Sequence, residues 1–158
     1  MDEGNELKDV IIYTDGACCG NPGPGGYGTV LMFNNNRKEL SEGFQNTTNN
    51  RMEILAVIKG LEALKTKCRV VIYSDSRYVV DAIEKGWLKK WRSNNWMRNK
   101  KDRALNVDFW SRMWDLLEEH EVKFKWVKGH ADNEENGRCD FLATQAAKQP
   151  NLLEDVRV

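Results

Sequence analysis

The chain has 158 residues, of which 30% are charged and 41% hydrophobic, and its 24 basic residues balance 24 acidic ones. This length suits one domain with a core of its own, and a net charge of zero argues against a uniformly basic nucleic-acid binder. No apolar run approaches the ~20 residues that span a bilayer, and the first residues lack the pattern of a signal peptide, so we expect a cytoplasmic protein without membrane contact.

The first part of the chain predicts a flexible terminus over residues 1–7 and then three β-strands. The strands are expected over Lys8–Asp15, Gly26–Phe33 and Lys38–Phe44, where β-branched and apolar residues are bounded by Gly, Pro and Asn. The short polar turn before Lys38 makes the last two strands an antiparallel hairpin. The glycines between the first two strands lack side chains, so we expect them to form a surface that a substrate can approach closely.

A helix followed by a fourth strand is predicted next. Short polar residues at 47–50 can cap a helix that runs to about Lys65, with one apolar stripe and Glu53 at its edge in the first turn. The positive end of the helix dipole would favour the ionised form of this carboxylate. The strand Arg69–Asp75 repeats the pattern of Lys8–Asp15, and the helical crossover predicts that these two strands pair in parallel.

The second half of the chain is expected to be mainly helical around one further strand. A short helix opens at Ser76 and ends near Glu84, and helices are also predicted from Leu105 or Asn106 to His120 and from Asn136 or Gly137 to Lys148. Val122, Phe124 and Trp126 alternate with lysines and predict a half-buried strand. Residues 149–158 are expected to form a tail.

The charge is unevenly distributed, because Lys85–Arg103 holds eight basic residues and one acidic residue. The rest of the chain is therefore net acidic. A local basic patch on an acidic body is typical of a docking surface for a polyanion. Three tryptophans lie in this segment. Trp91 and Trp96 could equally be packing residues, whereas Trp87 is the better candidate for stacking on a deoxyribose.

The four cysteines favour neither a zinc site nor a disulfide framework. Cys18 and Cys19 are adjacent, Cys68 and Cys139 stand alone, and no pair has the CxxC spacing. We therefore expect all four to be reduced thiols.

Four carboxylates fall at the ends of predicted elements: Asp15, Glu53, Asp75 and Asp140. Singly, each is explained by a turn, a cap or a helix N-terminus. If the parallel strands are adjacent, however, Asp15 and Asp75 reach the same edge of the sheet, and clustered carboxylates need a counter-charge. Hard oxygen ligands suit Mg²⁺, with Mn²⁺ as a second choice, and two ions about 4 Å apart can hydrolyse a phosphodiester. His130, on a loop, could transfer a proton.

Six motifs along the chain resemble type 1 ribonuclease H, in its short bacterial form, over about residues 8–148. They are Tyr13-Thr14-Asp15-Gly16, Gly20-Asn21-Pro22-Gly23-Pro24-Gly25-Gly26-Tyr27-Gly28, Thr47-Thr48-Asn49-Asn50-Arg51-Met52-Glu53, Ser74-Asp75-Ser76, Trp126-Val127-Lys128-Gly129-His130-Ala131 and Asn136-Gly137-Arg138-Cys139-Asp140. The resemblance implies an α/β ribonuclease H-like fold, a five-stranded mixed sheet in the order 3-2-1-4-5 flanked by helices. It also implies a monomer that cuts the RNA strand of RNA/DNA hybrids and leaves 5′-phosphate and 3′-hydroxyl ends.

The resemblance assigns roles to individual residues. The four carboxylates become the ligands of two Mg²⁺ ions, and His130 becomes the residue for proton handling or product release. Contacts to the hybrid are implied for Gly16, Cys18, Asn21, Thr48, Asn49, Asn50, Arg51 and Asn136. The basic segment resembles the family's basic protrusion, which implies a grip on the DNA strand by Trp87, Lys89, Lys90 and Trp91. None of these contacts reads base edges, so we expect low sequence specificity.

The chain departs from the family pattern at several positions. Arg77 stands where glutamine is usual and could add a phosphate contact, or its charge could lower the pKa values of the metal site. Gly137 replaces the usual glutamate, and Arg92-Ser93-Asn94-Asn95 replaces a tight basic run after Trp91.

Two other function classes are compatible with the same motifs. A non-catalytic hybrid-binding module would keep the fold and the basic segment, but it would have no use for four carboxylates that oppose a polyanion. A polynucleotidyl transferase of the integrase kind shares the logic of the fold, but the Asn-Asn-Arg-Met-Glu helix start and the Trp-rich segment argue against it.

Overall fold

The computed structural model describes residues 7–128 and 133–157 of the chain. Over these residues, five strands form one mixed sheet in the order β3-β2-β1-β4-β5, as expected for the ribonuclease H-like fold. The strands are β1 (Lys8–Cys18), β2 (Gly23–Phe33), β3 (Asn36–Thr47), β4 (Cys68–Ser74) and β5 (Glu121–Trp126). The expected flexible terminus lies outside the described residues, apart from Leu7.

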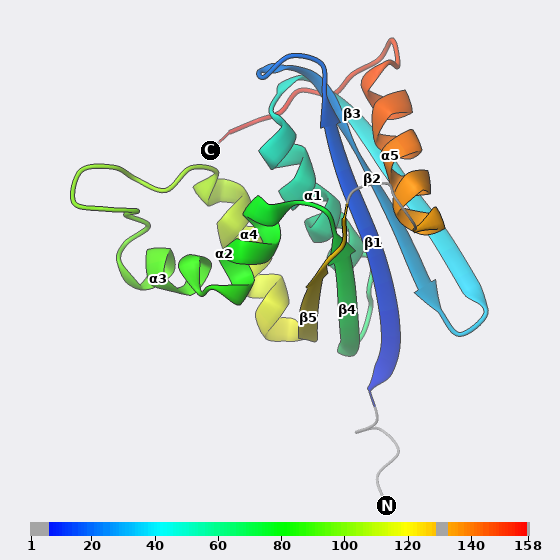
Figure 1. Cartoon of the computed structure of the whole chain (residues 1–158), viewed down its shortest axis with the longest axis horizontal. Helices are drawn as coiled ribbons and strands as arrows, with labels where there is room; N and C mark the ends of the chain where they lie inside the picture. The colour runs from blue at the N-terminus through cyan, green and yellow to red at the C-terminus, as the bar shows by residue number, and fades with distance from the viewer. Residues whose placement is uncertain (1–6, 129–132, 158) are drawn as a thin grey trace, which may run out of the picture.

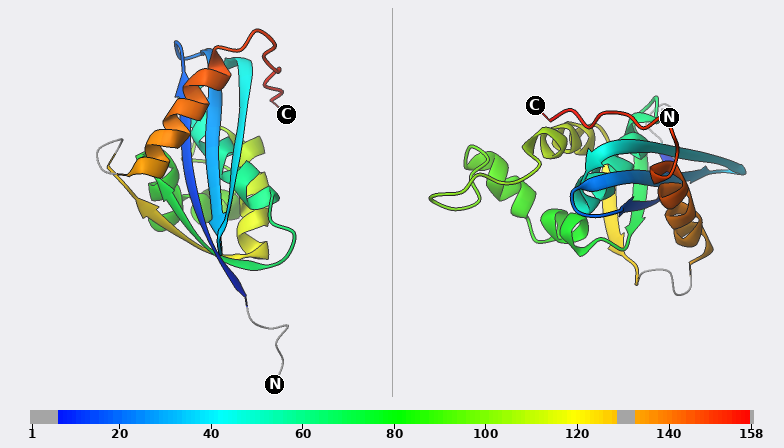
Figure 2. Two further views of the ribbon diagram at one scale, coloured as in Figure 1. Left: turned by 90° about the vertical axis from the view of Figure 1, so that its right-hand side faces the viewer. Right: turned by 90° about the horizontal axis from the view of Figure 1, so that it is seen from above.

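Helices cover both faces of the sheet (Figures 1 and 2). They are α1 (Asn49–Glu62), α2 (Arg77–Glu84), α3 (Trp87–Ser93), α4 (Val107–Glu119) and α5 (Glu134–Ala147). The helix α1 packs on β1, β2 and β3 and against α4, while α5 lies across β1, β2 and β3 on the opposite face. Most of the core lies between the sheet and α1, where Ile12, Ile58 and Ile72 are fully buried. None of the described helices combines the length and hydrophobicity needed to cross a membrane.

The pairing of β1 explains where on the sheet the candidate active site lies. β1 pairs in parallel with β4, with Val10 opposite Val70 and Thr14 opposite Ser74. The parallel pairing of these two strands that the repeated strand pattern predicted is therefore confirmed. β4 then ends, whereas β1 continues to Cys18 along β2. The prediction that the first strand stops at Asp15 was wrong, because β2 starts three residues earlier than expected and supplies a partner to those residues.

The glycines at the start of β2 have a packing role that the sequence did not predict. A Cβ at Gly26 would lie 2.5 Å from the Ala143 carbonyl oxygen, and one at Gly28 would lie 2.2 Å from that of Cys139. Both glycines therefore let α5 approach the sheet closely. The turn proper is limited to residues 19–22. Gly26 and Gly28 are covered by α5 and are closed to substrate, whereas Gly20 in the turn is exposed.

Three helix predictions needed correction. The segment after Gly86 contains α3, which starts behind a residue in the left-handed region (φ 75°). α5 begins at Glu134, two to three residues before the expected start, because the Asn133 side chain accepts hydrogen bonds from the N–H groups of Glu135 and Asn136. α1 ends at Glu62 rather than near Lys65.

Candidate active site

Two of the four carboxylates meet because two parallel strands end in register. Thr14 and Ser74 form the last pair between β1 and β4, so Asp15 and Asp75 are the residues that follow this pair along the two segments. Asp15 stays in β1, 4% exposed, with its Oδ1 accepting a hydrogen bond of 2.9 Å from the Gly16 N–H. Asp75 lies in the connection to α2, where Ser76 caps the helix. The expected meeting of Asp15 and Asp75 at one edge is confirmed.

Glu53 completes a cluster of three carboxylates on three different segments. Oxygen atoms of Asp15, Glu53 and Asp75 all lie within 4.8 Å of one another. Glu53 is 5% exposed and is the fifth residue of α1, which has no acidic residue in its first turn. Its expected place in the first turn was therefore wrong, because α1 starts at Asn49.

Burial and mutual repulsion dominate the electrostatics of this cluster. Desolvation, and then the charge of Asp75, raise the pKa of Asp15 to about 8. The pKa of Glu53 is also raised well above its ordinary value, first by burial and then by Asp15. The expectation that the helix dipole favours ionised Glu53 was wrong in sign, because desolvation and two neighbouring carboxylates outweigh it.

The donor set of the cluster fits a hard divalent cation. Among the described residues, Glu53 Oε1 and Asp75 Oδ1 are buried without any hydrogen-bond partner. An unpaired buried carboxylate oxygen is costly, and carboxylate oxygens without nitrogen or sulfur donors suit Mg²⁺ or Mn²⁺. The three residues therefore form a cation site whose ion the geometry does not identify.

Asp140 approaches the same cluster from the other face of the sheet. It lies on α5, and its carboxyl raises the pKa of Asp15 through its charge and a hydrogen bond between the two side chains. The packing of α5 on β1 brings it there, since the Cys139 thiol donates to the Tyr13 carbonyl oxygen. The fifth candidate, His130, lies outside the described residues.

The expected substrate contacts around the start of α1 lie together. The Thr48 hydroxyl accepts a hydrogen bond from the Arg51 N–H and caps the helix. The Asn21 side chain crosses from the turn between β1 and β2 and accepts a hydrogen bond of 3.1 Å from the Asn49 N–H. Asn49 and Asn50 are exposed, so this rim presents amide groups to solvent, as a surface that holds backbone phosphates requires.

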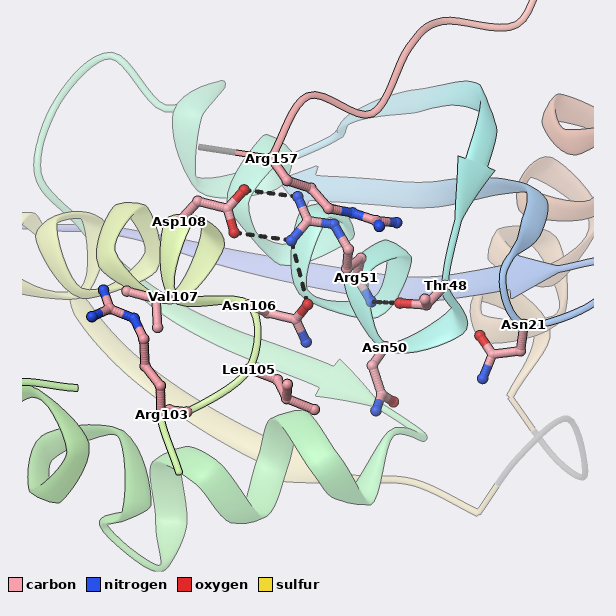
Figure 3. Close-up of a pocket in the computed structure, with 11 residues that line it drawn as sticks. Asn21, Thr48, Asn50, Arg51, Arg103, Leu105, Asn106, Val107, Asp108 and Arg157 are labelled. Atoms are coloured by element: carbon pink, nitrogen blue, oxygen red, sulfur yellow. Dashed lines mark hydrogen bonds and ion pairs between the residues drawn. The ribbon is translucent and has the colours of Figure 1, made fainter. Parts of the chain in front are cut away.

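Arg51 does not have the free side chain that a substrate contact needs. It is 2% exposed, and its guanidinium binds both oxygens of Asp108 on α4 (Figure 3). It also binds both oxygens of Asp155 in the C-terminal segment. It also lies over the Phe109 ring at 3.9 Å. Two carboxylates that are distant in sequence thus take the donors of this side chain, so a contact of Arg51 with substrate would involve its backbone.

We expect Arg51→Gln to lower the free energy of unfolding by about 3 kcal/mol, since it leaves two buried carboxylates without their counter-charge. Denaturant unfolding at pH 7 measures this. Arg112→Gln is the matched control, because Arg112 makes a half-exposed pair with Glu62 that is worth less than about 1 kcal/mol. Equal effects of the two substitutions would contradict the structural role of Arg51.

Gly16 and Cys18 are also engaged within the fold. A Cβ at Gly16 would lie 2.6 Å from the Glu53 nitrogen, so this glycine lets β1 touch α1. The Cys18 thiol donates to the carbonyl oxygens of Gly23 and Thr47. A contact of either residue with substrate would therefore involve the backbone. Asn136 differs, because its buried amide has no hydrogen-bond partner among the described residues on either polar atom.

The basic segment carries its candidate residues on and around α3. Trp87, Lys89 and Lys90 are exposed, and Trp87 remains available for stacking. Trp91 and Trp96 are partly buried against the core, and the Trp91 ring lies 6.1 Å from that of Trp110. For these two tryptophans the packing alternative is confirmed.

Arg77 lies beside the cluster and packs on Trp126, which the sequence pattern assigned to the inward face of β5. Its guanidinium lies 3.8 Å from the centroid of the Trp126 ring, and the Trp126 Nε1–H donates to the Asp75 carbonyl oxygen at 3.1 Å. Alternation in β5 predicted an inward Trp126, but its side chain is 39% exposed. The signal for this role is its position in β5, two residues after the buried Phe124 and opposite Ser74 at the end of β4.

The raised pKa values predict how the metal-free protein responds to pH. A carboxyl whose folded pKa is above its unfolded value contributes stability below the unfolded pKa, and that stability is lost as pH rises through the folded pKa. For Asp15 this window extends from about 4 to about 8. We expect the Tm with EDTA to fall across it, and Mg²⁺ to raise the Tm more at pH 8 than at pH 5. Asp15→Asn should flatten both trends, whereas an unchanged profile would contradict the electrostatics of the cluster.

Comparisons with known proteins agree with this geometry. A family model described as RNase H matches residues 7–148. The chain is 65% identical to a ribonuclease H of Desulforamulus reducens, with 98% of each chain covered, and 53% identical to a ribonuclease HI of Synechocystis sp., with 94% of each covered. Among solved structures, LC9-RNase H1 matches with a TM-score of 0.81 at 31% identity, over 90% of this chain and 73% of that one. LC11-RNase H1, solved in complex with an RNA/DNA hybrid, matches with a TM-score of 0.67 at 26% identity, over 87% and 96%.

Proposed function

This chain belongs to the ribonuclease H family, whose members hydrolyse the RNA strand of RNA/DNA hybrids, and we propose that it does so with two Mg²⁺ ions held by Asp15, Glu53, Asp75 and Asp140. The observation that carries the proposal is the group of three carboxylates formed by the buried Asp15 of β1, the buried Glu53 of α1 and the half-buried Asp75 just after β4, whose oxygen atoms lie within 4.8 Å of one another. Divalent cations bound there would activate water for attack on a phosphodiester and stabilise the charge on the leaving oxygen.

The residues of the chain prepare this site for a charged ligand. Asp15 is oriented by the Gly16 N–H, and Asp75 is held near it by the end of β4. The orphaned oxygens of Glu53 and Asp75 remain available for coordination. Rigid strands and a buried helix carry all three groups, so little reorganisation is needed when an ion binds. His130 is the proposed proton-handling residue. The products are expected to carry 5′-phosphate and 3′-hydroxyl ends.

The hybrid is proposed to lie across the start of α1 and the basic segment. Asn21, Thr48, Asn49 and Asn50 offer amide and hydroxyl groups on one side of the carboxylate cluster. Trp87, Lys89 and Lys90 are exposed on α3. Arg77 and Asn136 lie on the elements that flank the cluster, and backbone contacts of Gly16 and Cys18 complete the proposed surface. Phosphate contacts through these groups predict low sequence specificity and steep salt dependence of binding.

The proposal is tested by incubating the protein with end-labelled RNA/DNA hybrid, duplex RNA and duplex DNA in Mg²⁺. We expect cuts only in the RNA strand of the hybrid, and no cuts when EDTA replaces Mg²⁺. Tight hybrid binding without cleavage would instead support the non-catalytic module. Monomeric protein and cytoplasmic location are part of the proposal, and sedimentation of the free chain tests the first of them.

A further inference from the structure

A cavity of about 620 Å³ lies where the starts of α1 and α4 face each other (Figure 3). Asn21, Thr48 and Asn50 line one side, at the start of α1, the helix that also carries Glu53. Arg157, next to the end of the chain, lines the cavity as well. The family model ends at residue 148, so it assigns nothing to this arginine.

The arginines of this cavity differ in how far their guanidinium groups are exposed. Arg51 lines the cavity, but it is 2% exposed and its donors are taken by Asp108, which also lines the cavity, and by Asp155. Arg157 is different, since its side chain is 46% exposed and its ion pair with the buried Asp155 is long, at 3.7 Å. An anion that enters the cavity therefore meets the guanidinium of Arg157 rather than that of Arg51.

The C-terminal segment is fixed on the body of the protein close to Arg157. Leu153 adds a short parallel bridge to β3, with its N–H donating to the Gly43 carbonyl oxygen and its own carbonyl accepting from the Gln45 N–H. Two residues later the Asp155 side chain, 2% exposed, accepts hydrogen bonds from the Thr47 hydroxyl at 2.7 Å and from Arg51 Nε at 2.8 Å.

Arg157 itself has one further anchor. Its Nη2 donates to the Asn46 carbonyl oxygen at 3.2 Å, at the end of β3 beside the Thr48 cap. The Arg157 side chain is one of those that line the cavity (Figure 3). A guanidinium presents five N–H donors in a planar fork that matches phosphate oxygens, so this one can keep its backbone anchor and still bind an anion.

We propose that Arg157 binds a backbone phosphate of the RNA/DNA hybrid, and that the C-terminal segment from Leu153 to Arg157 is part of the substrate-binding surface. The inference rests on the proposed function, because it takes the polyanion at the carboxylate cluster to be the ligand. A duplex that reaches Glu53 passes the start of α1, where the cavity opens. The cavity thus receives a phosphate of the same ligand.

The test is the binding of a fluorescent RNA/DNA hybrid to metal-free protein, followed by anisotropy over a series of salt concentrations. We expect Arg157→Gln to raise Kd about fivefold at moderate salt and to reduce the slope of log K against log [salt] by about one, as loss of one phosphate contact requires. Arg69→Gln is the matched control, because Arg69 is a half-exposed arginine at the start of β4, far from the cavity. It should leave both quantities unchanged.

Arg157→Lys separates the effect of the positive charge from the effect of the planar guanidinium group. It keeps the positive charge but lacks the planar fork, so we expect a wild-type slope with a smaller loss of affinity. An Arg157→Gln protein that behaves like Arg69→Gln would overturn the inference, and so would an Arg157→Lys protein that loses the full unit of slope. Failure of the proposed function gives a different result, since the wild-type protein would then bind the hybrid without cutting its RNA strand in Mg²⁺.

Discussion

Asp15→Asn should reduce the rate of RNA cleavage by a factor on the order of 10⁴, a loss typical of removing a central catalytic group. Asp15 is the residue of the cluster on which the other carboxylates converge, since Asp75 and Asp140 both act on its pKa. Asparagine keeps the shape of the side chain but supplies one neutral oxygen in place of a charged carboxylate, so it is a poor ligand for Mg²⁺. Single-turnover cleavage of a labelled hybrid measures the loss.

The same substitution should keep hybrid binding intact or tighten it, because it removes one negative charge from the path of a polyanion. Asp9→Asn is the matched control. Asp9 lies on the same strand, at the opposite end from the site, and makes only an exposed pair with Arg69. We expect wild-type activity from it. Full activity of Asp15→Asn in Mg²⁺ would refute the metal-dependent mechanism.

The sheet and the approach of Asp15 to Asp75 could be predicted from local patterns. Val10-Ile11-Ile12-Tyr13 and Val70-Val71-Ile72-Tyr73 are short apolar runs separated by a predicted hairpin and a capped helix, and this arrangement favours parallel neighbours. The register then follows from the two runs, since Tyr13 pairs with Tyr73. Their aspartates must end at one edge whatever the rest of the chain does.

The role of Arg51 could not be predicted in this way, because its partners lie 57 and 104 residues away in the sequence. The resemblance to ribonuclease H implied a substrate contact, and nothing local distinguishes a free arginine from one whose donors a distant segment occupies. The same holds for Gly26 and Gly28, whose packing partner is α5. Local patterns describe elements, whereas the surfaces that cover them depend on contacts between distant segments.

Gly16→Ala should lower the free energy of unfolding by about 3 kcal/mol, which is at the upper end of the cost of overpacking. It should also reduce kcat by about 100-fold, because it displaces a catalytic group. The added Cβ would lie 2.6 Å from the Glu53 nitrogen and 2.7 Å from the Met52 carbonyl carbon. Both are backbone atoms of α1, so no side chain can rotate away, and the helix must move from β1. Glu53 then moves away from Asp15, which separates two ligands of the proposed cation site.

Gly137→Ala is the control for the stability effect, because a Cβ there meets nothing within 4 Å and the residue lies inside α5. Alanine should stabilise that helix by roughly 0.5–1 kcal/mol, the usual gain over glycine. Thermal unfolding compares the two variants, and titration with Mn²⁺ reports the cation site without any need for cleavage. Weaker Mn²⁺ binding by Gly16→Ala alone would show that this glycine maintains the distance between β1 and α1. A wild-type Mn²⁺ affinity in a destabilised Gly16→Ala protein would show that the cluster tolerates the shift, and that the contact at Gly16 serves stability only.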